Sequence, residues 1–429
     1  MNRHEVKIFK LLEKRYIYFF LSILYKLLLD ISYVNFVNPL YGYSGFHINF
    51  NILQYFFGWI LFLLLLILSP HLMNKISDYF HSQALFALLA PIIVLYGMDS
   101  NLPLTPVIYS LASILFIRWL TNTSIKTPKI SIVPIIKNGD KIFYLISLIM
   151  VIYLVCWYFF SGAVNNINFN ITKVYEFREK NSAITNIGIL AYVNDWVYSV
   201  FSLSLLGYSL WRKKYITFLF VIICQIFFYS ISAHKSVLFA PFFVIGIYFY
   251  FSRTNALSSV PLVFSTTVLC GLLLYNIVNE TIFPSMFIRR VFFVPANLTY
   301  VYFEFFQHNP YSMWSNSILK FIQPNIYEAG ISKTIGIYIG TDIYANNGYI
   351  SSGFAQAGLL GIFLYSIILG IYLKWLNILS NKGPTLWLGL ILVVTPLRSL
   401  LISSDLLTVM LTHGLFVATL MLILLRKNK

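Results

Sequence analysis

Twelve long apolar stretches constrain the fold of this chain more than any other feature of its sequence. A helix of ~20 mostly apolar residues crosses the hydrocarbon core of a bilayer, which is about 30 Å thick. The stretches therefore predict an all-α polytopic membrane protein with about 12 transmembrane helices, forming a single integral membrane domain over residues 1–429. They lie near residues 16–36, 52–69, 83–98, 103–120, 142–161, 188–210, 215–231, 236–252, 260–278, 354–373, 384–402 and 406–425.

The composition excludes a water-soluble fold. Hydrophobic residues make up 59% of the chain and charged residues only 10%, whereas an ordinary soluble domain carries about 25% charged residues. A soluble fold could not bury this much apolar surface, so lipid must cover the remainder.

Charge and cysteine usage exclude two further classes. The net charge of +16 is spread between the apolar stretches and forms no compact basic module, so we expect no nucleic-acid partner. The three cysteines, Cys156, Cys224 and Cys270, all lie inside apolar stretches and form no CxxC pair. Neither a disulfide framework nor a zinc site is expected.

The basic segments predict the topology, because positive loops favour the cytoplasmic side of a membrane. With the N-terminus inside, the segments near 7–15, 126–141, 212–214, 374–382 and 426–429 all face the cytoplasm, as does Arg253. The short outer loops at 37–51 and 97–103 contain no Lys or Arg. Both termini are therefore predicted to be cytoplasmic. The first stretch is predicted to be a retained helix, because no small-residue cleavage pattern follows it.

Two longer segments, 162–187 and 279–353, then fall outside the membrane. Both contain basic residues, although Lys and Arg usually favour cytoplasmic loops. A loop as long as the second is seldom a passive connector. Its part at 285–307 is aromatic and amphipathic, so we expect it to lie along the outer interface.

Arginines in these outer segments are the first candidates for chemistry. They are Arg178, Arg289 and Arg290. The guanidinium group is a rigid fork of donors that suits phosphate oxygens. The alternative is that each arginine anchors the protein to lipid headgroups.

Spacing links Arg290 to two further polar residues. Arg290, Asn297 and Glu304 recur every seven residues, so one continuous helix would place them on one face with only ~20° of drift per heptad. Pro295 could instead begin a second helix after a bend. A polar stripe facing water is the competing interpretation.

Three other positions carry charge near or within apolar stretches. Lys235 stands where two short helices meet at the outer face, and it could contact pyrophosphate or only reach the interface. Arg398 lies inside an apolar stretch, where arginines face a cavity or a partner, and Asp405 could pair with it. Lys26 and Asp30, at i and i+4, are expected to form a neutralising pair.

The second outer segment resembles the O-antigen polymerases of the Wzy type. The resemblance is carried by RRVFFVPANLTYVYFEFFQHNP and by the later TDIYANNGYISSGFAQAGLLGIFLYSIILG, and it covers roughly residues 140–375. SAHKS, which contains Lys235, is similar to a short basic outer turn of the family. Arg178 and Gly188 fit a family spacing that is usually one residue longer. The matching residues are Arg290, Phe293, Pro295, Ala296, Tyr300, Tyr302, Glu304, Phe305, Phe306, Asn309 and Pro310, followed by Asn346, Gly348, Gly353, Gly358 and Gly361.

The resemblance implies an enzyme of the bacterial cytoplasmic membrane that acts on its outer side. A polymer on undecaprenyl pyrophosphate is transferred to the non-reducing end of an undecaprenyl-pyrophosphate-linked repeat unit. No metal and no cofactor is needed. Membrane lipids and a chain-length regulator are the other implied partners.

Residue roles follow from that reaction. Arg290 and Arg178 would stabilise the departing pyrophosphate. Glu304 would be the base that accepts the acceptor proton, with Asp342 as its rival. Substrate contacts are assigned to Arg289, Lys235, Arg398, Tyr302, Asn297, Asp342 and Asn346.

Three other functions compete with polymerisation. An O-antigen ligase would rely on a histidine in the large outer loop, where His308 stands. A flippase or other transporter would be expected to show internal repeats, and the sequence has none. A non-catalytic scaffold would explain neither the long outer segment nor its positive charge.

Overall fold

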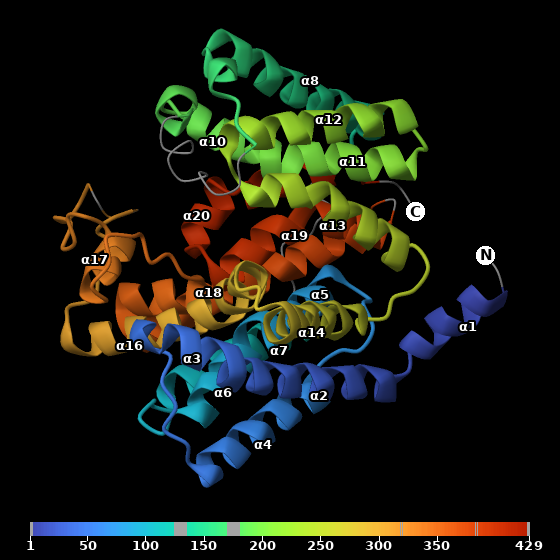
Figure 1. Ribbon diagram of the computed structural model, residues 1–429. Coiled ribbons are helices and arrows are strands. Elements are labelled where there is room, and N and C mark those ends of the chain that lie inside the picture. The colour runs from blue at the N-terminus through green and yellow to red at the C-terminus, as the bar shows by residue number, and fades with distance from the viewer. Residues whose placement is uncertain are drawn as a thin grey trace. The chain divides into compact units, whose positions relative to one another are not determined.

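The described residues form helices joined by turns and loops, the longest of them between His308 and Ile331 (Figure 1). The computed structural model describes residues 3–123, 135–169, 181–317, 319, 321–381, 383 and 385–426. These residues contain no β-strand, and only two isolated bridges join extended residues, Asn49 with Asp99 and Leu72 with Ala256.

Each of the twelve apolar stretches is mainly helical, although a turn at 412–414 divides the last one. Among the described residues, 7 helices are long and apolar enough to cross a membrane. They indicate a membrane-embedded protein, whereas twelve crossings and an outer loop remain predictions. The seven are Arg15–Ser44, Ile76–Met98, Gly139–Phe160, Tyr215–Ser232, Ser259–Val278, Tyr349–Asn381 and Leu406–Leu424; shorter apolar helices are Ile52–Leu68, Lys235–Phe251 and Leu386–Ile402.

The chain divides into two compact units, and a single domain over the whole chain stays a prediction. The first unit is Met1–Ile125, Thr254–Lys374 and Arg398–Leu406. Its elements are α1 (Arg3–Leu12), α2 (Arg15–Ser32), η1 (Tyr33–Val37), α3 (Asn38–Tyr41), η2 (Gly42–Ser44), α4 (Ile52–Leu68), α5 (Ile76–Gln83), η3 (Ala84–Leu89), α6 (Ala90–Met98), α7 (Thr105–Asn122), α14 (Ser259–Val278), α15 (Ile282–Pro284), η7 (Ser285–Phe293), α16 (Val294–His308), α17 (Ile331–Tyr338) and most of α18 (Tyr349–Asn381).

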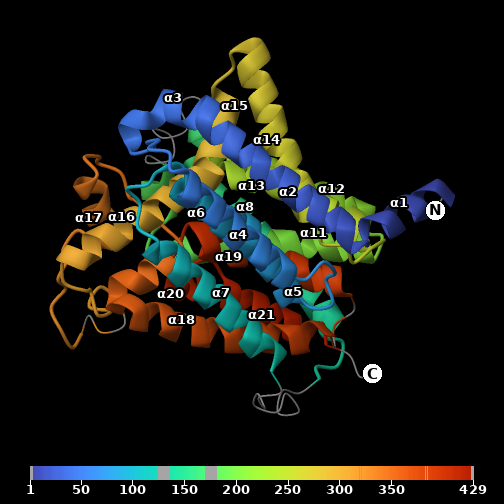
Figure 2. The ribbon, with the colours of Figure 1, turned by 90° about the horizontal axis from the view of Figure 1, so that it is seen from below.

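Aromatic packing holds the first unit together. In Figure 2, α2 runs beside α14, and α4 runs beside α6. The buried Tyr25 ring meets Phe86, Phe264 and Phe292 at centroid distances of 5.6, 5.8 and 5.7 Å. Its hydroxyl donates to the Phe86 carbonyl at 2.7 Å, so the buried phenol is hydrogen-bonded. These contacts join α2 to α14 and to η7.

The predicted pair of Lys26 and Asp30 is confirmed. Lys26 Nζ lies 2.6 Å from Asp30 Oδ1, and both side chains are almost fully buried. Tyr55 on α4 donates to Asp30 Oδ2 at 3.0 Å, and the Lys26 ammonium lies 4.6 Å from the centre of the Trp59 ring. Both charges are therefore paired, as burial in an apolar interior requires.

The second unit is Lys126–Arg253, Trp375–Leu397 and Leu407–Lys429. In Figure 1, α8, α11 and α12 lie side by side. Gly207 lets α11 approach the rest of the unit closely, because a Cβ there would lie 2.8 Å from Leu388 and 3.3 Å from Ile391. Its elements are α8 (Gly139–Phe160), η5 (Ala163–Asn166), α10 (Leu190–Trp196), η6 (Val197–Phe201), α11 (Ser202–Trp211), α12 (Tyr215–Ser232), α13 (Lys235–Phe251), most of α19 (Leu386–Ile402) and α20 (Leu406–Leu411), and α21 (Leu415–Leu424).

Candidate functional site

A continuous helix made of η7 and α16 carries five of the ten predicted site residues: Arg289, Arg290, Asn297, Tyr302 and Glu304. The π-helical η7 passes directly into α16, and Val294 at the junction has helical φ and ψ of −62° and −49°. Pro295 therefore does not begin a separate helix after a bend. We attribute this to the wider π turn before it, which accommodates a residue that has no N–H and that crowds the preceding turn of an α-helix.

The polar residues spaced by seven are accessible along this helix. Arg290 and Glu304 are exposed and Asn297 is partly exposed, whereas most residues between them are buried. The Asn297 amide donates to the Ser44 carbonyl at 3.4 Å, next to Gly45, whose φ of +88° favours glycine. The helix therefore presents a cation and a carboxylate to its surroundings and ties its middle to the loop after α3.

Arg289 is held in place by an aromatic ring. Its guanidinium carbon lies 4.1 Å from the centre of the Tyr41 ring, and its Nε donates to Ser285 Oγ at 3.3 Å. Burial lowers the pKa of the Arg289 guanidinium, and Tyr41 opposes this shift. Arginine still stays protonated in proteins, so Arg289 is a fixed positive charge next to the exposed Arg290.

Glu304 accepts a hydrogen bond from a neighbouring helix. The Tyr338 hydroxyl, at the end of α17, donates to Glu304 Oε1 at 3.1 Å. Partial burial and this hydrogen bond raise the pKa of the Tyr338 phenol, so the phenol remains a donor at neutral pH. The second carboxylate oxygen has no hydrogen-bond partner among the described residues, so it can accept a further hydrogen bond.

Asp342 is placed differently from Glu304. It forms an ion pair with Lys333, and the Lys333 ammonium also donates to the Asp342 backbone carbonyl at 2.6 Å. The Asp342 side chain is 96% exposed. The Asp342 carboxylate is therefore already engaged by an ammonium, whereas Glu304 contacts only a neutral phenol.

Tyr302 and the segment that contains Asn346 have structural contacts. The buried Tyr302 hydroxyl donates to the Ala345 carbonyl at 2.9 Å, so Tyr302 fixes this segment against α16. Asn346 is exposed. The neighbouring Asn347 is buried, and its amide lies 2.9 Å from the Pro295 carbonyl and 2.8 Å from Ser351 Oγ. The sequence argument did not identify Asn347, because nothing in the chain shows which of two adjacent asparagines faces inward.

The glycine-rich segment that carries part of the family resemblance begins α18, which is interrupted near its start. Ala357 and Gly358 have non-helical φ and ψ, and Gly358 has a φ of +59°. A Cβ on Gly361 would lie 2.0 Å from the Gly353 carbonyl oxygen. The segment after α16 is hydrogen-bonded to α18 next to this break, because the Ser312 N–H donates to the Ala355 carbonyl at 2.9 Å.

Arg398 and Asp405 do not pair. Among the ion pairs of the described residues, none joins them. Asp405 Oδ2 accepts a hydrogen bond from Tyr365 at 2.8 Å, and Trp314 donates to the same Tyr365 oxygen at 3.1 Å. Arg398 is exposed near the end of α19, which ends at Ile402. Asp405 lies beyond this end, so a spacing of seven no longer places the two residues on one face.

Lys235 and Arg178 belong to the second unit. Lys235 is the first residue of α13, directly after a turn in which Ala233 has a φ of +55°. The buried Asn181 supports this turn by donating to the Ile231 carbonyl at 2.7 Å. The predicted location of Lys235 at a turn between two helices is confirmed. Arg178 lies outside the described residues.

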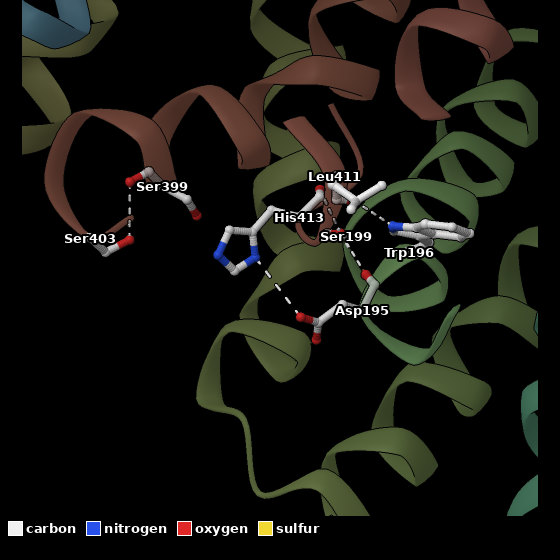
Figure 3. Close-up of polar contacts among 7 residues, drawn as sticks. All are labelled: Asp195, Trp196, Ser199, Ser399, Ser403, Leu411 and His413. Atoms are coloured by element: carbon white, nitrogen blue, oxygen red, sulfur yellow. Dashed lines mark hydrogen bonds and ion pairs between the residues drawn. The ribbon is translucent and has the colours of Figure 1, made fainter. Parts of the chain in front are cut away.

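A second polar cluster in this unit was not predicted (Figure 3). His413 Nδ1, after α20, lies 3.9 Å from Asp195 Oδ2 on α10. Trp196 donates to the Leu411 carbonyl at 2.7 Å, and Ser199 Oγ lies 3.3 Å from the His413 carbonyl. These contacts tie α10 and η6 to the turn before α21.

Within the described residues, no group of three or more His, Cys, Asp or Glu side chains is placed to hold a metal ion. Comparisons of the chain with family models, curated proteins and solved structures find no match. The arrangement on η7 and α16 can supply fixed positive charge for an anion and one carboxylate for a proton.

Proposed function

We propose that this chain is a membrane glycosyltransferase that polymerises undecaprenyl-pyrophosphate-linked oligosaccharides on the outer side of a bacterial cytoplasmic membrane. The observation that carries the proposal is the grouping of Arg289, Arg290 and Glu304 on one helix. The Arg289 guanidinium is held against the Tyr41 ring, while Arg290 and Glu304 are exposed. The resemblance to Wzy-type polymerases rests on the same segment.

The proposed reaction is a single displacement at a sugar carbon. A hydroxyl oxygen of the repeat unit attacks the anomeric carbon of the growing polymer, and a new glycosidic bond forms. The bond from that carbon to the pyrophosphate oxygen breaks, and undecaprenyl pyrophosphate leaves with the bonding electrons. Glu304 takes the hydroxyl proton.

The arginines stabilise the charge that develops on the leaving group. Forked guanidinium donors match pyrophosphate oxygens, and fixed donors gain strength where water is scarce. Arg290 is assigned the contact that strengthens in the transition state. Arg289 is assigned to orienting the pyrophosphate, because its stacking on Tyr41 limits its motion.

The test is polymerisation by purified chain in vesicles that contain lipid-linked repeat units. Arg290→Ala should reduce the rate ~10²–10³-fold, as loss of one such donor does. Arg290→Lys should restore little activity, because an ammonium lacks the planar fork. The control is Arg253→Ala, which removes an arginine from a predicted cytoplasmic loop and should leave the rate unchanged. Long chains made by Arg290→Ala at normal expression would contradict the proposal.

One observation favours an O-antigen ligase as the alternative. His308 is exposed and ends α16, four residues after Glu304, so it follows Glu304 by one helical turn. A ligase would transfer finished glycan to a lipid A core. His308→Ala should then abolish transfer to the core, whereas a polymerase should retain chain elongation in this variant.

A further inference from the structure

An open groove of about 510 Å³ lies between α2–η1 and α4 in the first unit. We call it the α2–α4 groove. Its apolar walls include Ile31 and Val34 from α2–η1 and Phe50 from the loop before α4. Its volume is within the range of about 300–1,000 Å³ typical of ligand sites.

The walls of the groove lie in a membrane-spanning element. Ile31 and Val34 belong to the candidate span Arg15–Ser44 and are both exposed. Exposed aliphatic side chains within a span face hydrocarbon, so the occupant must present an apolar chain to them.

The groove also contains polar groups, which a purely lipid-facing surface would lack. Asp30, paired with Lys26 and Tyr55, lines it together with the exposed Asn35. No hydrogen-bond partner of the Asn35 amide is found among the described residues. An amide without a partner in hydrocarbon costs several kcal/mol, so the polar end of the occupant must leave the groove beside Asn35, and its apolar part lies along Ile31 and Val34.

One helix separates the groove from the arginines. Tyr33, on the same turns of η1 as the groove residues, packs its ring 5.3 Å from Phe293 of η7. The Tyr41 ring, at the end of α3, lies against the Arg289 guanidinium. The loop after α3 contacts Asn297 through Ser44 and continues to Phe50 in the groove. The loop after α3 therefore contacts both the groove and the helix that carries the positive charge.

We propose that the α2–α4 groove holds the isoprenoid chain of the polyprenyl-pyrophosphate substrate, and that the pyrophosphate reaches Arg289 and Arg290 over the loop after α3. This inference rests on the proposed function and adds a binding place for the lipid part of its substrate. An isoprenoid pyrophosphate combines an apolar chain with an anion, which is the combination that the groove and the arginines together fit.

Photo-crosslinking tests the groove directly. A benzophenone amino acid at Val34 is compared with one at Leu27, which is on the same helix and equally 43% exposed but does not line the groove. The full chain sits in phosphatidylethanolamine vesicles with labelled undecaprenyl pyrophosphate. Crosslinking at Val34 should exceed that at Leu27 by about tenfold and disappear with excess unlabelled probe, as for one saturable site. Equal labelling at both positions, or labelling that competitor leaves unchanged, would show that the probe contacts the lipid-facing surface without a specific site and would overturn the proposal.

Filling the groove gives an independent measurement. Val34→Trp should raise KM for lipid-linked repeat units about tenfold and change kcat less than about twofold, since uniform binding is lost. Leu27→Trp should change neither. An unaltered KM in Val34→Trp would contradict the proposal.

The two experiments separate this inference from the proposed function. Competed crosslinking at Val34 supports the groove even if no polymer forms, and only the polymerase assignment then fails. Arg290-dependent polymerisation without competed crosslinking overturns the groove and leaves the polymerase assignment intact.

Discussion

At the residue scale, the two carboxylates differ in their contacts. Glu304 has one carboxylate oxygen without a hydrogen-bond partner among the described residues, whereas Asp342 is held by Lys333. In the proposed polymerase, this difference assigns the role of base to Glu304. Sequence spacing proposed both residues but could not rank them, because Tyr338 and Lys333 reach them from other parts of the chain.

Glu304→Gln should therefore lower kcat by about 10²–10⁴-fold with little change in KM, because general-base catalysis is lost and binding is retained. Asp342→Asn should leave kcat within about threefold of the wild-type value. Steady-state kinetics on lipid-linked repeat units measures both. A large kcat loss in Asp342→Asn, with Glu304→Gln fully active, would reverse the assignment.

The sequence does not reveal that His81 lowers the stability of the fold. Its ring is buried on α5, and neither nitrogen has a hydrogen-bond partner among the described residues. Replacing an unpaired buried polar group by an apolar one removes its desolvation cost. His81→Leu should therefore stabilise the protein by about 1–2 kcal/mol.

Thermal unfolding in detergent measures this effect. The control is His71→Leu, at a partly exposed position, which should change stability by no more than about 0.5 kcal/mol. A lower Tm in His81→Leu would show that the ring is satisfied by an internal water.

At the element scale, local sequence predicted the helices well and their interruptions poorly. The twelve apolar stretches are helical because apolar length is a property of the segment itself. The π-helical turns η1, η3, η6 and η7 and the break in α18 depend on neighbouring elements. The sequence shows the glycine-rich pattern of α18 but not why glycine is needed there. The fold shows the cause, which is close contact between the backbones at Gly353 and Gly361.

Gly361→Ala tests that reason. Its Cβ would overlap the Gly353 carbonyl oxygen, so the variant should lose about 1–3 kcal/mol of stability through overpacking. Gly246→Ala, in the exposed middle of α13 with no atom within 4 Å of its Cβ, should gain about 0.5–1 kcal/mol through helix propensity. Chemical unfolding curves of the two variants should shift in opposite directions, and equal shifts would contradict this account.

At the scale of the whole molecule, the distribution of basic residues predicts which loops face the cytoplasm. The helices alone do not determine this orientation. Basic residues cluster in the segments assigned to the cytoplasm, and both units consist of helices that could face either way. Apolar runs alone could not give the division of the chain into two units, because α18 and α19 contribute residues to both.

Cysteine labelling in intact cells checks this topology in a variant whose native cysteines are replaced by serine. Ile322→Cys, in the large predicted outer segment and 81% exposed, should react with a membrane-impermeant maleimide from outside. Lys213→Cys, in a predicted cytoplasmic loop, should react only after permeabilisation. The opposite pattern would invert the assigned orientation.

The buried Lys26–Asp30 pair has a consequence for how the protein is made. Each charge alone at the centre of a helix would oppose insertion by roughly 2.5–3.5 kcal/mol. Both partners lie on α2, one turn apart, so the pair forms as soon as that helix does. The first spanning helix can thus enter the membrane already neutralised, during synthesis and before α4 delivers Tyr55 and Trp59.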